Sequence, residues 1–274
     1  MTVPAVVGVY GGGRMGAGIA HAFAVAGSAV TVVENDEPAA AAARARVEKS
    51  LAKSAELGAA AGGTVSVVTD PAALASATLV VEAVPELVEI KHAVLAAITR
   101  SAPDAVIGTN TSSLSIDALA SALPDPSVLI GLHFFNPVPA SGLVEVVVGA
   151  RTAPALVGQA QEWVRGLGKH AITVQDSPGF ASSRLGVAIA LEAMRMVEEG
   201  VAGAEDIDNA MTLGYRHPVG PLRTTDIVGL DVRLAIAEHL ERELGPRFAP
   251  PQVLRDKVAA GHLGRKTGEG FYRW

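Results

Sequence analysis

The chain lacks cysteine, a basic excess and long apolar runs, and each absence excludes some chemistry. Without cysteine there can be no disulfide, no thiolate metal site and no cysteine nucleophile. Charged residues make up 18% of the 274 residues and the formal net charge is −6, so no basic excess is present to neutralise a phosphate backbone. We therefore expect no nucleic-acid partner and no metal site.

Apolar residues are plentiful, at 49%, but they occur in short runs of alanine and valine. None of these runs reaches the roughly 18 residues that a membrane span needs. The amino terminus leads almost directly into the apolar residues 6–10, without the charged and apolar regions of a secretion signal. We expect a cytoplasmic protein without a membrane partner. Its length is sufficient for two domains, although length alone also allows one.

The first half of the sequence alternates short β-branched runs with longer alanine-rich stretches. We expect helices at residues 15–26, 38–57, 87–100, 116–123 and 154–167. Strands are expected at residues 5–10, 29–33, 65–69, 78–82, 106–109, 128–132, 142–148 and 170–175. Such alternation, with strands apolar on both faces, is typical of a parallel sheet covered by helices.

The pattern changes after the segment DSPG at residues 176–179, which is a strong breaker of regular structure. Only helical periods follow, at residues 180–199, 204–213, 221–244 and 252–260. We therefore predict an α/β protein in two domains. A Rossmann-type, mostly parallel sheet domain would span residues 1–176, and an all-α carboxy-terminal domain would span residues 177–274.

A glycine-rich turn follows the first expected strand. Gly11, Gly13 and Gly16 fit the pattern G-x-G-x-x-G, which Arg14 and Met15 complete. In this pattern the first glycine allows a tight turn, the second lets a pyrophosphate approach the backbone, and the third lets the helix pack closely. Glycine-rich turns without a ligand are common, but the position between a strand and a helix favours a dinucleotide site.

Glu34 stands at the end of the second expected strand, directly after residues 29–33, close to the roughly 20 residues after the glycines where a ribose-binding acid is expected. A carboxylate there accepts hydrogen bonds from the ribose hydroxyls of NAD and repels the 2′-phosphate of NADP, which predicts NAD as the cofactor. Alternatively, Glu34 is a solvated strand-end carboxylate. Arg14 either assists a phosphate or is merely solvated.

A histidine and a carboxylate are candidates for proton transfer. His133 stands at the end of a strand on the carboxyl edge of the sheet, where ligands of such folds bind. Glu145 interrupts the apolar residues 143–148, and because burying it unpaired is costly, an imidazole is its obvious partner. We predict that the two form a general base. The alternatives are a packed histidine and a glutamate on the solvated face of an edge strand.

Two further polar segments follow expected strands. Glu86 and Lys91 are either functional or an ordinary helix-start acid and a surface lysine. Residues 109–113, which include Ser112, offer several hydroxyls at the same edge of the sheet, or they cap the helix that follows. The residues alone leave both questions open.

Together these motifs resemble the 3-hydroxyacyl-CoA dehydrogenase family over nearly the whole chain. The resemblance rests on the glycine motif, residues 82–91, NTSSL at 110–114, HFFNPVP at 133–139 with Glu145, and DSPGF at 176–180. It continues with EDID at 205–208, GRKTG at 264–268 and GFY at 270–272. It implies an NAD-dependent oxidoreductase that acts on a short-chain 3-hydroxyacyl-CoA such as 3-hydroxybutyryl-CoA.

The resemblance also implies roles for individual residues. His133 would be the general base with Glu145 as its partner, while Asn136 and Ser112 would position the substrate oxygen and the nicotinamide. The acid at 86 and the lysine at 91 would contact NAD. The carboxy-terminal helices would form a homodimer interface and one wall of the acyl cleft.

Three positions depart from the family pattern. Ser183 stands where an asparagine near the substrate is usual, and Glu34 stands where an aspartate is usual. Leu57 occupies the position of the lysine that usually contacts the CoA nucleotide, with Lys49 and Lys53 one or two helical turns earlier. Ser183 and Lys53 are therefore candidate substrate-binding residues.

Two other functions are consistent with the sequence. The same chemistry could act on an acyl-carrier-protein thioester in secondary metabolism. A non-catalytic NAD-binding or structural protein is the alternative of another class. The four polar residues His133, Glu145, Asn136 and Ser112 argue against that last alternative, because a structural role gives no reason for them.

Overall fold

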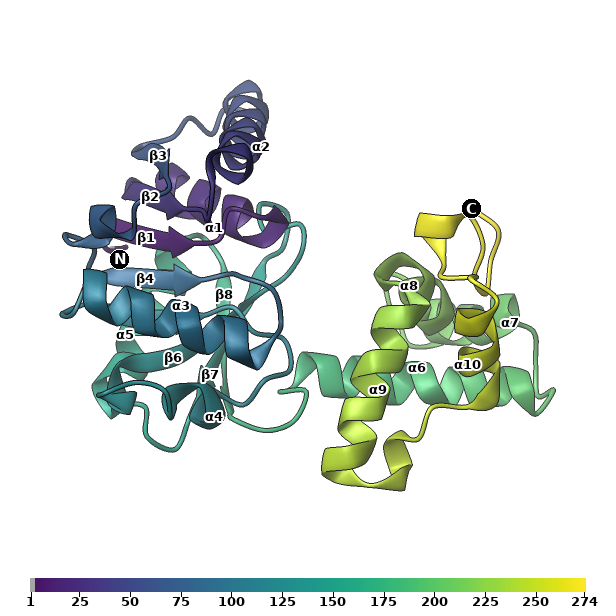
Figure 1. Ribbon diagram of the computed structural model, residues 1–274. Helices are drawn as coiled ribbons and strands as arrows, with labels where there is room; N and C mark the ends of the chain where they lie inside the picture. Colours follow the sequence, from purple (N-terminus) through teal and green to yellow (C-terminus); the bar gives the residue numbers. More distant parts are fainter. Residues whose placement is uncertain (1–2) are drawn as a thin grey trace. The chain divides into compact units, whose positions relative to one another are not determined.

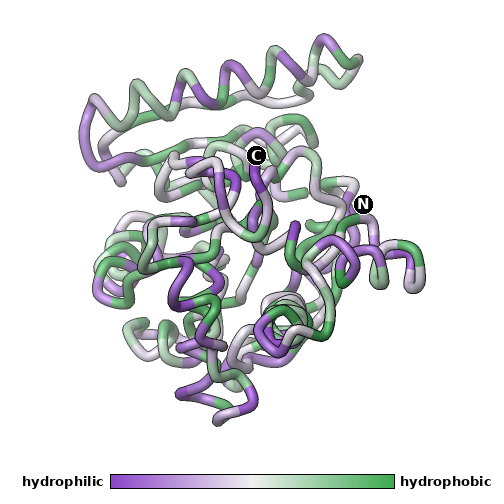
Figure 2. The backbone as a smooth tube through the Cα atoms, turned by 90° about the vertical axis from the view of Figure 1, so that its right-hand side faces the viewer, coloured by the Kyte–Doolittle hydropathy of each residue, from purple (hydrophilic) through white to green (hydrophobic). Residues whose placement is uncertain are grey.

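A computed structural model describes residues 3–274. The chain divides into two compact units, of which the first ends at Ser177 and the second spans Pro178–Trp274 (Figure 1). Among the described residues, no helix is long and apolar enough to cross a membrane. Figure 2 shows hydrophobic and hydrophilic residues alternating along the coils, as expected of helices that bury one face.

The first unit is built on one sheet, which has eight strands within residues 3–177. The strands are β1 (Val6–Tyr10), β2 (Ala29–Val33), β3 (Thr64–Val68), β4 (Leu79–Glu82), β5 (Val106–Thr109), β6 (Leu129–Phe134), β7 (Leu143–Val148) and β8 (His170–Gln175). Their order is β3-β2-β1-β4-β5-β6-β7-β8. All neighbours are parallel except β6 and β7, which are antiparallel.

Helices cover both faces of this sheet. They are α1 (Arg14–Val25), α2 (Glu37–Glu56), α3 (Val88–Ser101), α4 (Ile116–Ala120) and α5 (Pro154–Gly166), with short 3-10 turns at Pro71–Leu74 and Pro126–Val128. Ile19 and Phe23 of α1, Val47 of α2 and Leu156 of α5 belong to one apolar core with the strands. The start of α2 is encoded locally, because Asp36 accepts a hydrogen bond from the Ala39 backbone N–H at 2.8 Å.

The sheet order brings functional segments to one edge. The chain leaves β1 for β2 on one side and reaches β4 on the other, so the connections after β1 and β4 diverge. A crevice at the carboxyl ends of the strands is expected at such a reversal of strand order. The glycine-rich turn follows β1, and Glu82 ends β4.

The second unit is helical. It contains α6 (Ser182–Glu198), α7 (Ala204–Asn209), α8 (Pro221–Val228), α9 (Leu230–Leu244) and α10 (Gln252–Ala259), with short turns at Ala210–Gly214, Pro246–Phe248 and Arg265–Thr267. Its separate core is formed by buried residues of all five helices, among them Leu191, Ile207, Leu222, Leu240 and Leu254. The predicted fold class is confirmed, with an α/β unit followed by an all-α unit.

One expected helix is wrong. Residues 221–244 form two helices rather than one, because Gly229 adopts a positive φ of 109° between them. Asp226 lies next to this break and accepts hydrogen bonds from the backbone N–H groups of Phe271 and Tyr272, both at 2.9 Å. The carboxy-terminal segment thus packs against the bend, which helical periodicity alone does not reveal.

Candidate active site

The glycine-rich turn has the backbone that the sequence motif requires. Gly11 has a φ of +94°, a conformation that L side chains rarely adopt. A Cβ at Gly16 would collide with the Gly11 carbonyl, whereas a Cβ at Gly13 would meet no atom within 4 Å. The turn is therefore tightly packed at Gly16 and open at Gly13. The first turn of α1, which begins there, has no side-chain cap among the described residues.

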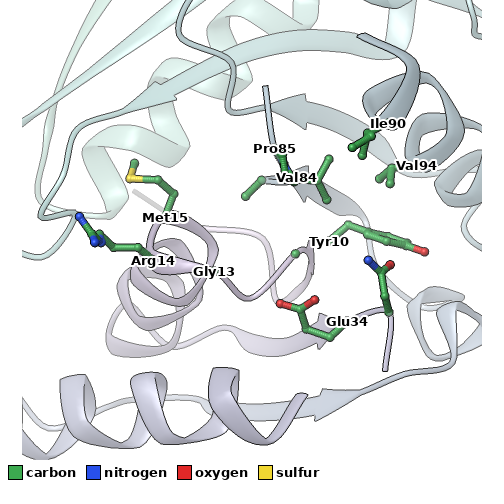
Figure 3. A pocket seen from close by; sticks show the side chains of 12 residues that line it. Tyr10, Gly13, Arg14, Met15, Glu34, Val84, Pro85, Ile90 and Val94 are labelled. Atoms are coloured by element: carbon green, nitrogen blue, oxygen red, sulfur yellow. The ribbon is translucent and has the colours of Figure 1, made fainter. Parts of the chain in front are cut away.

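A pocket of about 490 Å³ lies against this turn (Figure 3). Glu34 lines it, and one carboxylate oxygen accepts a hydrogen bond from the Gly12 backbone N–H at 2.6 Å. Val84, Pro85 and Ile90 supply apolar surface. The pocket therefore combines apolar surface, a carboxylate and an uncapped helix start, which suits the adenosine and pyrophosphate of a dinucleotide.

Lys91 is fully buried rather than a surface lysine. Its Nζ donates to both carboxylate oxygens of Glu82, at 2.8 and 2.9 Å, and lies 3.3 Å from a Glu86 oxygen. The Thr109 hydroxyl donates to Glu82 at 2.6 Å. Sequence analysis did not single out Glu82 or Thr109. A carboxylate that ends the apolar strand β4 was the available signal, by the argument applied to Glu145.

Glu86 organises the loop after β5. Its Oε1 accepts hydrogen bonds from the Thr111 hydroxyl at 2.6 Å and from the backbone N–H groups of Ser112 and Ser113 at 2.7 and 3.0 Å. Burial would raise the pKa of Glu86, but the Lys91 ammonium and the hydrogen bonds outweigh it and hold this pKa below its ordinary value. The loop is therefore tied to an ionised acid.

His133 and Glu145 face each other across neighbouring antiparallel strands. They are register partners of β6 and β7, and the His133 Nδ1 lies 2.7 Å from the Glu145 Oε2. His133 is 5% exposed and Glu145 is fully buried. Because β7 lies between β6 and β8, Glu145 is not on the solvated face of an edge strand.

Two exposed polar residues follow the strands beside this pair. Ser112 follows β5 and Asn136 follows β6, and these parallel strands end at the same edge of the sheet. Asn110, which directly follows β5, accepts a hydrogen bond from the Phe134 backbone N–H at 2.9 Å and fixes the end of β6. The structure therefore gathers the polar segments after β5 and β6 at one edge.

A second pocket, of about 700 Å³, also belongs to the first unit. One wall carries the cations Arg14, Arg46, Lys49 and Lys53, and the other is the loop of residues 136–140. We call it the cationic pocket. Its lining includes no carboxylate, so it suits an anionic ligand.

Arg14 lines both pockets, and Figure 3 shows its side chain pointing away from Glu34. Met15, beside it, lines only the first of them. Leu57 lies in the cationic pocket and is 77% exposed. Ser183, by contrast, is on α6 of the second unit, at the second residue of that helix.

Comparisons with known proteins identify the family. Residues 6–177 match the 3-hydroxyacyl-CoA dehydrogenase NAD-binding domain, and residues 179–274 match the carboxy-terminal domain of that family. The chain is 42% identical to a 3-hydroxybutyryl-CoA dehydrogenase of Mycobacterium tuberculosis over 98% of both chains. It is 38% identical to human mitochondrial hydroxyacyl-coenzyme A dehydrogenase, covering 98% of this chain and 90% of the human protein.

Solved structures agree with this result. The crystal structure of (S)-3-hydroxybutyryl-CoA dehydrogenase from Ralstonia eutropha superposes with a TM-score of 0.93 at 37% identity, over 99% of both chains. The resemblance and the NAD cofactor expected from the sequence are confirmed. The chain belongs to the 3-hydroxyacyl-CoA dehydrogenase family.

Proposed function

We propose that this protein oxidises the 3-hydroxyl of a short-chain 3-hydroxyacyl-CoA, such as 3-hydroxybutyryl-CoA, with NAD as the electron acceptor. The observation that carries this proposal is the buried His133–Glu145 pair. It lies at 2.7 Å in the same sheet that carries the glycine-rich turn. A base and a dinucleotide site are the two components that such an oxidation needs.

The first pocket would hold the adenosine half of NAD. Gly13 leaves space for the pyrophosphate to approach the backbone at the start of α1, and Glu34 would accept hydrogen bonds from the ribose hydroxyls. Bound NAD supplies the acceptor for the hydride that leaves carbon 3 of the substrate. Through the loop after β5, Glu86 and Lys91 would act on the nicotinamide side of the cofactor.

His133 would take the proton of the 3-hydroxyl. Since its Nδ1 is engaged by Glu145, its Nε2 would be the nitrogen that takes the proton. The Glu145 carboxylate would hold the ring and stabilise the imidazolium that forms. Asn136 and Ser112, at the same edge of the sheet, would position the substrate oxygen and the nicotinamide.

The cationic pocket would bind the carrier of the acyl group. Lys53 and its neighbours provide several positive charges, and CoA carries phosphates on its nucleotide. An acyl carrier protein is the alternative carrier, because its prosthetic arm also begins at a phosphate. With either carrier, Lys49 and Lys53 would supply the positive charge that a lysine at the position of Leu57 usually supplies in this family.

We further propose a homodimer formed through the second unit, in a protein that we expect in the cytoplasm. Leu185 and Ile189 on α6, Val228 on α8 and Val232 on α9 are exposed, and these helices pack against one another. Beside Val232, Arg233 is 8% exposed although its Nε has no hydrogen-bond partner among the described residues. Such a surface suits cover by a second copy. Light scattering of the full chain would test the dimer.

An NADH-formation assay over a panel of thioesters tests the proposed reaction. The panel contains L-3-hydroxyacyl-CoA substrates of increasing chain length and the same acyl groups on an acyl carrier protein. We expect the highest kcat/KM for a short CoA thioester. If only the carrier-protein thioesters are turned over, the proposal of CoA as the carrier is wrong. NAD binding without turnover of any thioester would favour the non-catalytic alternative.

A further inference from the structure

The cationic half of α2 has few apolar contacts. The buried residues of this helix, Ala40, Ala43 and Val47, all precede Glu48, and beyond them Leu51 packs half-buried against the core of the first unit. Beyond them, Lys49, Lys53 and neighbouring side chains line the cationic pocket. Since one wall of the pocket depends on this second half, its few further contacts help to set the position of that wall.

A buried histidine makes such a contact. His21 of α1 is 4% exposed, and its Nε2 lies 2.7 Å from the hydroxyl of Ser54, a residue of the second half of α2 that lines the pocket. Its Nδ1 has no hydrogen-bond partner among the described residues. Burial and the nearby charge of Lys169 lower the pKa of His21, so its ring is neutral near pH 7.

The opposite wall, the loop of residues 136–140, is held by contacts close to His21. The Nζ of Lys169 donates to the backbone carbonyls of Val138 and Ser141, at 2.7 and 2.6 Å. Val138 also packs on α1, where a Cβ at Gly18 would lie 2.8 Å from the Val138 Cβ. Gly18 is one helical turn before His21, so the contacts of both walls converge on the same stretch of α1.

We propose that His21, together with Ser54 and Lys169, is a positioning cluster that sets the spacing between the two walls of the cationic pocket for the CoA carrier. This inference rests on the proposed function, because it assumes that the pocket binds a phosphorylated carrier. His21 acts through Ser54 and the backbone and does not touch the reacting atoms.

A purely structural role does not explain this histidine well. An apolar side chain of similar size would fill the space under α2 without leaving a buried ring nitrogen unpaired. The imidazole is useful only if the bond to Ser54 matters. That bond fixes α2 at the helical turn of Lys53, which lines the pocket.

The test compares His21→Leu, His21→Gln and Ser54→Ala with wild type. His21→Leu and Ser54→Ala remove the hydrogen bond, while His21→Gln can keep a side-chain nitrogen near the position of Nε2. Ser66→Ala is the matched control, because it removes a serine hydrogen bond to Thr31 in the sheet. Calorimetric titration with CoA and, separately, with NAD gives the two dissociation constants, and steady-state kinetics with 3-hydroxybutyryl-CoA gives KM and kcat.

We expect His21→Leu and Ser54→Ala to weaken CoA binding by about two- to tenfold, the loss of one hydrogen bond, with KM rising in parallel and kcat unchanged. NAD affinity should stay at the wild-type value in all variants, and His21→Gln and Ser66→Ala should bind CoA like wild type. Unchanged CoA affinity in His21→Leu and Ser54→Ala, or an equal loss of NAD affinity, would overturn the inference.

Failure of the proposed function has a different signature. If wild type binds CoA and the variants weaken that binding, but no thioester is turned over, the positioning cluster stands and the proposed reaction is wrong. If the thioester is turned over with the same KM in every variant, the reaction stands and the positioning cluster is wrong.

Discussion

Replacing Glu145 by glutamine isolates the electrostatic part of the proposed base. The substitution keeps the size of the side chain and a group that can hydrogen-bond to His133, but it removes the negative charge. In wild type, the 2.7 Å contact joins a fully buried carboxylate to a ring that is 5% exposed. When His133 takes the hydroxyl proton, this carboxylate faces an imidazolium from which water is largely excluded.

The structure sets the expected size of the effect. With atoms in contact at 2.7 Å, the charge centres of the pair lie about 4 Å apart, and an effective dielectric constant of about 20 gives an attraction of about 4 kcal/mol. If most of this energy is realised in the transition state, kcat falls by about 10²- to 10³-fold. This range overlaps the 10²- to 10⁴-fold typical of general-base catalysis.

The assay is the single-turnover rate of NADH formation with saturating substrate, and NAD affinity measured by titration serves as the control. His133→Gln should be at least as slow as Glu145→Gln. The fold loss of rate in the double variant should be much smaller than the product of the losses in the two single variants, because the two residues act as one unit. A fall of less than about tenfold for Glu145→Gln, or full multiplicativity, would refute the paired-base argument.

Four other outcomes are expected. Glu34→Ala should reduce the ratio of kcat/KM for NAD to kcat/KM for NADP, mainly because NAD binds more weakly. Ser183→Asn should change the ratio of kcat/KM between unsubstituted and 2-substituted thioesters, since serine leaves more room than asparagine. Lys91→Met leaves the buried carboxylate of Glu82 without a cationic partner and should lower the free energy of unfolding by about 3–5 kcal/mol in urea titrations. The control Arg44→Ala, which removes an exposed ion pair, should lower it by about 1 kcal/mol or less. Because the folded-state pKa of His21 lies below 6.5, the unfolded chain binds the proton first. The Tm of the wild type should therefore decrease as the pH is lowered below 6.5, and the Tm of His21→Gln should decrease less over the same range.

Much of the fold was predictable because its signals are local. The β-branched runs that become β2, β5 and β8 end where their residue types change, at the bounds expected from the sequence. The glycine motif also carries its meaning locally, because the φ of Gly11 and the close approach at Gly16 require glycine whatever the rest of the chain does. The break at Gly229 was missed, since a glycine inside a helical period is compatible with either outcome.

The pairing of side chains from distant strands depends on the sheet. The cost of burying Glu145 predicts that it has a partner, but only the antiparallel register of β6 and β7 places it against His133. The same cost of burying a carboxylate applies to Glu82, but the sequence does not identify its partner. That partner is Lys91, a helix residue that the sequence allows equally well as a surface lysine. Burial, which decides between a surface lysine and a buried ion pair, is a property of the packed molecule.

The order of the elements, the glycine-rich turn and the family could be predicted from the sequence, because residue types and short spacings carry them. Tertiary structure alone decided which polar groups share an environment: the His133–Glu145 contact, the buried Glu82–Lys91 pair, and the histidine under α2 whose bond to Ser54 spans two helices. The physical reason is that the energy of a buried polar group depends on its partners in space, and the sheet brings together partners that the sequence separates.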